Sequence, residues 1–219
     1  MRKLTLAVVL VFFGLTAAVA KADTVLFTTG PLSTANLPAY AINMGYETAG
    51  SFSLTSAATA TGVDFGLDIG GDGTGTVEDV DWAIETAAFG GTTVASGTAS
   101  VTTGTENSNG IYDASFSLGS GVALSAGTTY WLVLSDATIS GSSNDVDWAV
   151  SGTNDSASSS EITGSACAPA TSCGITQSLA FDITSSGAPN QTPEPSSLLL
   201  LGSGLAALAI AYRRRRLTV

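Results

Sequence analysis

The stretch that decides the fold is Gly62-Val63-Asp64-Phe65-Gly66-Leu67-Asp68-Ile69. Its large apolar side chains occupy every second position, and glycine or aspartate fills the positions between them. Such alternation puts the apolar side chains on one face of a β-strand and the polar ones on the other. The stretch therefore predicts a strand with one buried face and one face in water.

Similar alternation recurs over 79–85 and 179–184, and the segment 130–134 is apolar on both faces, which is typical of a central strand. Segments rich in Gly, Ser, Asn and Asp, such as 70–73 and 140–144, predict turns. We therefore expect an all-β domain over 23–186, an antiparallel β-sandwich or jelly roll. The expected strands are 24–28, 39–46, 50–55, 60–69, 76–86, 92–102, 110–118, 128–136, 145–151 and 177–184.

Two short segments resemble each other, Glu-Asp-Val-Asp-Trp-Ala-Ile at 78–84 and Asn-Asp-Val-Asp-Trp-Ala-Val at 144–150. The similarity is too short for a repeat architecture. We interpret it as two strands that direct a valine, a tryptophan and an aliphatic side chain into the core, with chance similarity as the alternative. Trp82 and Trp148 are then core residues, and Trp131 is the tryptophan expected to reach the surface.

The charges are segregated along the chain. Residues 23–192 contain 17 of the 18 acidic residues and no Lys or Arg, and the chain has no His. The absence of a basic surface excludes nucleic-acid binding. Without His, the commonest general base and metal ligand are missing. We therefore expect no enzymatic activity, the alternative being a glycosidase that works with two carboxylates.

The N-terminus reads as an export signal. Arg2 and Lys3 precede an apolar run over 4–18, and Ala20 and Ala22 supply small residues before Asp23. This layout predicts a signal peptide over 1–22. A transmembrane anchor is the alternative, for which the run is short.

The C-terminus has three consecutive parts: a Pro-rich linker at 187–195, an apolar run at 196–212 and a basic tail at 213–219 that contains Arg213, Arg214, Arg215 and Arg216. As a helix the apolar run would span roughly 25 Å at 1.5 Å per residue. The arginines place its C-terminal end in the cytoplasm by the positive-inside rule. We expect a transmembrane helix, the alternative being a buried soluble helix.

Pro193-Glu194-Pro195, the apolar run and the arginines together resemble the PEP-CTERM sorting tail. The resemblance implies a Gram-negative bacterial protein that is exported and recognised by an exosortase, a membrane transpeptidase. It also implies an association with exopolysaccharide and biofilm. The expected function is that of an exported, membrane-tethered, non-enzymatic cell-envelope or biofilm-matrix protein, anchored by its C-terminal helix or released to the matrix.

The body of the chain resembles the choice-of-anchor ectodomains found on such proteins. The resemblance rests on Phe-Gly-Gly-Thr-Thr-Val-Ala-Ser-Gly at 89–97 and Leu-Ser-Ala-Gly-Thr-Thr-Tyr-Trp-Leu at 124–132. It implies a β-rich surface domain and transfers no catalytic residues.

One pair of side chains is a candidate for a disulfide bond, and a group of acidic side chains is a candidate for metal binding. Cys167 and Cys173 predict a disulfide in an exported protein, and a metal pair is the alternative. Acidic residues around the glycine-rich loop 70–73 supply the oxygen ligands that Ca²⁺ prefers, although the spacing is not that of an EF-hand. Solvated surface charge is the alternative for these acids, and the expected function has carbohydrate or Ca²⁺ binding as its own alternative. The expected metal ligands are Asp68, Asp72, Glu78 and Asp79, and a second acidic group is Asp145, Asp147 and Asp155.

Overall fold

The computed structural model describes residues 23–30, 38–71, 73–152, 160–163 and 173–186, and every regular element in these ranges is a strand. The strands are β1 Thr24–Thr28, β2 Ala39–Ala41, β3 Glu47–Ser53, β4 Ala58–Ile69, β5 Thr76–Val77, β6 Asp79–Glu85, β7 Thr93–Ser100, β8 Thr102–Glu106, β9 Ile111–Leu124, β10 Thr129–Ser135, β11 Ile139–Ser140, β12 Val146–Ala149, β13 Ser160–Thr163, β14 Cys173–Ile175 and β15 Phe181–Ser185.

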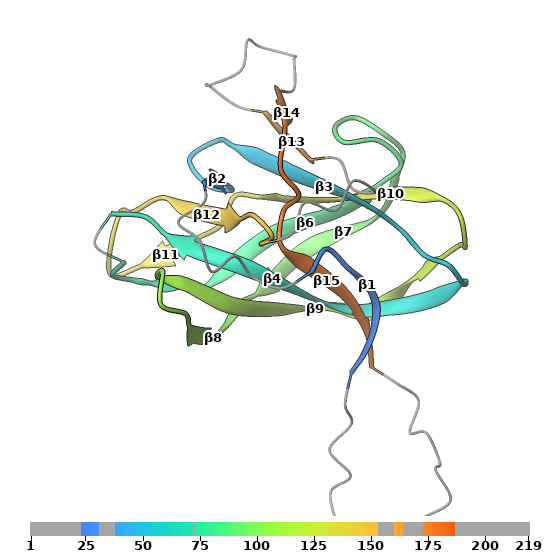
Figure 1. Cartoon of the computed structure of the whole chain (residues 1–219), viewed down its shortest axis with the longest axis horizontal. Coiled ribbons are helices and arrows are strands. Elements are labelled where there is room, and N and C mark those ends of the chain that lie inside the picture. The colour runs from blue at the N-terminus through green and yellow to red at the C-terminus, as the bar shows by residue number, and fades with distance from the viewer. Residues whose placement is uncertain (1–22, 31–37, 72, 153–159, 164–172, 187–219) are drawn as a thin grey trace, which may run out of the picture.

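These strands form two main antiparallel sheets (Figure 1). In the seven-stranded sheet the long strand β4 pairs with β9 on one side and with both β15 and β12 on the other. The outer strands are β8, which pairs with β9, β1, which pairs with β15, and β2, which pairs with β12. The six-stranded sheet has the order β14-β13-β3-β10-β6-β7, and β11 and β5 form a separate small ribbon. The expectation of an all-β, antiparallel fold is confirmed.

One hydrophobic core joins the inner faces of the two sheets. Val63, Phe65, Leu67 and Ile69 of β4 are all buried in it, whereas Asp64 and Asp68 on the other face are partly exposed. From the six-stranded sheet, β6 and β10 bury alternate side chains in the same core. The alternation read from the sequence thus identifies the buried face of β4 correctly.

Trp148 lies at the centre of this core. Its side chain is fully buried, its ring centroid lies 5.4 Å from that of Phe181 and 6.4 Å from that of Phe65, and its indole Nε1 donates a hydrogen bond to the Ala180 carbonyl oxygen at 2.9 Å. Trp82 is buried as well, from the opposite sheet, and Trp131 is partly exposed. The three tryptophan placements expected from the sequence are confirmed.

Several strand boundaries differ from the expected ones. The expectation of a strand over 39–46 is wrong beyond residue 41, because the chain turns at Met44 and Gly45, which both have positive φ. The expected strand 76–86 is divided at Glu78, whose backbone N–H donates to the Thr138 carbonyl oxygen outside either main sheet.

The expected strand 92–102 is also divided, at Val101. Here the chain leaves the six-stranded sheet at the end of β7 and enters the seven-stranded sheet as β8. The short strands β8, β11, β13 and β14 were not expected, because segments of two to five residues give no clear period-two signal. The expected strand 177–184 begins only at Phe181.

The first and last described strands are neighbours. β1 and β15 pair in antiparallel register, with Thr24 opposite Ser185, and run side by side in Figure 1. The two ends of the domain therefore leave it at one pole, which is called the terminal pole below.

Candidate functional site

The outer face of the seven-stranded sheet carries a row of carboxylates, called the acidic stripe below. β4 supplies two of them, and the antiparallel register sets Asp182 of β15 opposite Asp64 and Asp147 of β12 opposite Asp68. The neighbouring strand β9 supplies Asp113, which lies opposite Gly66. Like charges placed opposite each other on adjacent strands destabilise a sheet. The stripe, which consists of Asp64, Asp68, Asp113, Asp147 and Asp182, therefore has a cost in stability.

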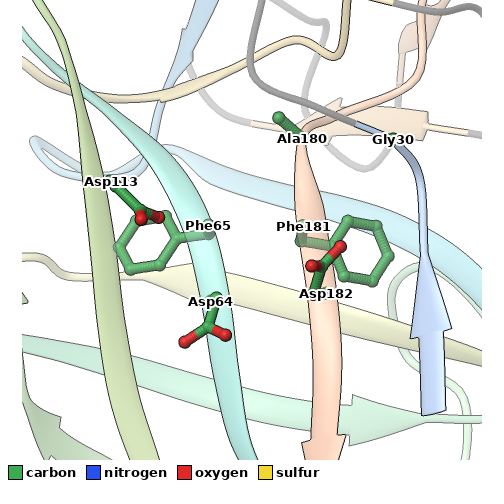
Figure 2. A pocket seen from close by; sticks show the side chains of 7 residues that line it. All are labelled: Gly30, Asp64, Phe65, Asp113, Ala180, Phe181 and Asp182. Atoms are coloured by element: carbon green, nitrogen blue, oxygen red, sulfur yellow. The ribbon is translucent and has the colours of Figure 1, made fainter. Parts of the chain in front are cut away.

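Three members of the stripe line a pocket of about 220 Å³. Figure 2 shows the carboxylates of Asp64, Asp113 and Asp182, one from each of three adjacent strands. The remaining lining residues are Gly30, Phe65, Ala180 and Phe181.

Burial and repulsion by neighbouring carboxylates both disfavour the ionised forms of Asp64 and Asp182. Burial raises the pKa of Asp64, and Asp113, Asp182 and Asp23 raise it further. Burial also raises the pKa of Asp182, against a hydrogen bond from the Thr28 hydroxyl that lowers it, and Asp113 adds repulsion. Because residues 23–192 contain no Lys, Arg or His, no basic side chain of this segment offsets that repulsion.

Asp147 has the most perturbed carboxyl of the stripe. Burial is the main cause, the charges of Asp145 and Asp68 add to it, and together they raise its pKa to about 6. Burial also raises the pKa of Asp68, its register partner. The carboxyls of Asp64, Asp68, Asp147 and Asp182 therefore bind protons more tightly in the folded protein than in the unfolded chain.

Replacing Asp147 by asparagine is expected to raise the melting temperature at pH 7.5 and to leave it unchanged at pH 4. The folded pKa of about 6 lies above the value of about 3.9 for an unfolded chain. The contribution of this carboxyl to stability is therefore full below about pH 4 and is lost as the pH rises through 6. Asparagine has no charge to desolvate, so it removes that loss.

Thermal denaturation of the wild type and the variant at pH 4, 5, 6 and 7.5 measures this effect. Glu78→Gln is the matched control, because this exposed carboxyl lies outside the stripe. Equal melting temperatures for the wild type and Asp147→Asn at pH 7.5 would show that the charge of Asp147 carries no penalty.

The expected calcium ligands that the structure describes lie in different parts of the fold. Asp68 lies on β4 in the seven-stranded sheet, whereas Asp79 begins β6 in the six-stranded sheet and accepts a hydrogen bond of 2.8 Å from the Ser100 hydroxyl. Glu78 is exposed between β5 and β6, and Asp72 lies outside the described residues. Among the described residues no three Asp, Glu, Cys or His side chains form a group that could hold a metal ion. A calcium site that includes Asp72 stays a prediction.

The other residues singled out in the sequence fall largely outside the described ranges. Cys173 begins β14, but Cys167 is not described, so the disulfide stays a prediction. The signal peptide, Pro193-Glu194-Pro195, the span 196–212 and the four arginines also lie outside these ranges, as does Asp155. In the part of the chain that is described, no helix is long and apolar enough to cross a membrane.

Sequence reasoning singled out Asp68 and Asp147 but missed Asp113 and Asp182 as candidate site residues. Asp113 and Asp182 are far from Asp64 in the sequence, and only the strand pairing brings them together. The alternation of Asp182 with Phe181 and Ile183 predicted a water-facing side chain but not its neighbours. A partner strand cannot be identified from a single strand's pattern, so this grouping was not predictable.

The described part of the chain thus defines a class of protein: an acidic domain of two antiparallel β-sheets. The C-terminal tail is more informative about the kind of protein than the fold is. Residues 191–216 match the PEP-CTERM protein-sorting motif. The match supports an exosortase-processed surface protein, and the motif implies export with anchoring at the membrane or cell surface. The comparison with curated proteins finds no match for the chain.

Proposed function

We propose that this chain is a non-enzymatic cell-envelope or biofilm-matrix protein, held at the membrane by residues 196–212 until an exosortase processes it at its PEP motif. The observation that carries the proposal is the position of the sorting motif. It begins at residue 191, and the last described strand, β15, ends at Ser185. A short linker then joins a folded domain directly to the sorting tail.

The arrangement of the termini supports display of the domain on a tether. Thr24 and Ser185 are register partners, so both ends leave from the terminal pole. A tether that continues from Ser186 holds the domain at this pole alone. The outer faces of both sheets then stay accessible to molecules outside the cell.

The chemistry of the described side chains supports a binding or structural role. The acidic stripe has no histidine to act as a base, and no lysine or arginine lies between residues 23 and 192 to stabilise a developing negative charge. A body whose ionisable charge is almost entirely negative also keeps a surface protein soluble and repels other copies of itself.

An epitope inserted between Ser108 and Asn109 tests surface display. These residues form the exposed turn that joins β8 to β9, a position where an insertion leaves the core intact. Antibody added to intact cells is expected to label the tagged protein. Labelling only after the cells are permeabilised would contradict the proposal, and an internal cytoplasmic protein serves as the control for cell integrity.

A further inference from the structure

A groove of about 510 Å³ hollows the outer face of the six-stranded sheet, away from the acidic stripe. Its floor includes Ala83 of β6 and Val133 of β10, which are register partners. Small ligand sites usually measure about 300–1,000 Å³. The groove is therefore large enough for a ligand of two or more rings.

One wall of the groove is the loop between β6 and β7. Its residues Ala88 and Phe89 pack with Val133, and Trp131 joins the same small apolar cluster. Phe89 is only partly buried and lines the groove, so part of its ring faces the open space. The loop thus supplies an aromatic surface that the main core does not use.

The loop has a defined shape before any ligand arrives. At its base the Thr86 backbone N–H donates to the Thr92 carbonyl oxygen at 3.1 Å, and the Thr92 N–H donates to the Thr86 hydroxyl oxygen at 2.9 Å. Gly91 packs so closely that a Cβ there would lie 2.4 Å from the Ala87 nitrogen. A wall held in this way loses little conformational entropy on binding.

The polar atoms around the groove are carboxylates and hydroxyls. The Thr98 hydroxyl donates to the Asp81 carboxylate, and the Thr93 hydroxyl donates to the Glu85 carboxylate at 3.2 Å. Each carboxylate keeps further acceptor sites, because it has about four lone-pair positions. The polar residues that line the groove are Glu47, Asp81, Glu85, Ser96, Thr98 and Ser135.

These groups select the charge of the ligand. Burial raises the pKa of Glu47, and the nearby charges of Asp136 and Glu85 raise it further, so negative charge is already crowded at this face. An anionic ligand would add to that repulsion. A single cation is a poor fit as well, because no three carboxylates in the described residues converge on one point. Asp81 and Glu85 lie four residues apart on one strand, or about 13 Å between their Cα atoms.

We propose that this groove binds a neutral glycan, with the apolar face of a sugar ring against Phe89 and sugar hydroxyls donating to Asp81 and Glu85. A sugar combines many hydroxyl donors with apolar C–H faces, which matches acceptors spread along an aromatic wall. The hydroxyls of Ser96 and Ser135 can donate to or accept from sugar oxygens. The proposal of glycan binding concerns the folded domain and does not depend on the sorting tail. An experiment can therefore contradict glycan binding and leave the proposed function intact, or the reverse.

Isothermal titration of the full chain in mild detergent tests the proposal with defined hexasaccharides. The neutral probes are cellohexaose, maltohexaose and mannohexaose, and the charged ones are the chitosan and alginate hexamers. We expect saturable binding of at least one neutral probe and none of alginate. Loss of one charge-assisted hydrogen bond weakens binding by about tenfold or more, so Asp81→Ala is expected to do so. Phe89→Ala removes the aromatic wall against which the sugar ring packs and is expected to weaken binding as well.

The matched control is Asp113→Ala, which removes an exposed carboxylate from the other sheet and is expected to leave binding unchanged. Circular dichroism checks that each variant is folded, and Asp81→Ala keeps the test decisive if Phe89→Ala disturbs the loop. Three results would each overturn the proposal: no neutral probe binds, only the chitosan hexamer binds, or binding survives both groove substitutions.

Discussion

Replacing Trp148 by alanine is expected to lower the free energy of unfolding by about 3–5 kcal/mol. The indole is fully buried between Phe65 and Phe181, so its loss leaves a cavity that rigid strands on both sides cannot close. The Ala180 carbonyl oxygen also loses the hydrogen bond from the indole N–H. A domain of this size has a stability of about 5–15 kcal/mol, so the substitution removes a large share of it.

Thermal denaturation followed by circular dichroism measures the loss, with an expected fall in melting temperature of about 6–20 °C. Trp148→Phe keeps an aromatic ring and loses the indole N–H, so its effect is expected to be smaller and remains measurable if the alanine variant does not accumulate. Trp131→Ala is the matched control, since this tryptophan lies partly exposed on the outer face of β10. An equal effect of Trp131→Ala and Trp148→Ala would contradict the central position of Trp148.

The fold class could be predicted from the sequence because the alternation that marks a strand lies within that strand. In β4 the valine, phenylalanine, leucine and isoleucine at alternate positions are all buried, as expected. The two similar segments around Trp82 and Trp148 likewise send their tryptophans into one core, although they belong to opposite sheets. Period-two alternation depends only on which face of one strand is buried, so no partner need be known.

Strand pairing and strand ends could not be predicted in this way. The division at Val101 depends on the chain passing from one sheet to the other, which no alternation within 92–102 reveals. The acidic stripe and the groove on the six-stranded sheet depend on register, which sets Asp64 opposite Asp182 and Ala83 opposite Val133. Register is a property of strand pairs, so both sites became visible only in the assembled sheets.

Removal of residues 193–219 is expected to release the protein from the membrane. On the proposed function, the apolar run 196–212 is the anchor, and the described strands, which end at Ser185, remain intact without it. The truncated protein should therefore stay folded and lose its attachment. A second variant, with alanine at Pro193, Glu194 and Pro195, keeps the apolar run and is expected to stay in the membrane with its tail uncleaved.

The most direct measurement is the division of the protein between the membrane fraction and the soluble fraction, periplasm and culture supernatant together, in cells without exosortase activity. It is quantified by immunoblot for the full chain and for a chain that ends at Thr192. The circular dichroism spectrum of the released protein serves as the folding control. The account predicts that the full chain stays in the membrane fraction of these cells and that the shortened, folded chain appears in the soluble fraction. Retention of the shortened chain in the membrane fraction at the level of the full chain would contradict the account.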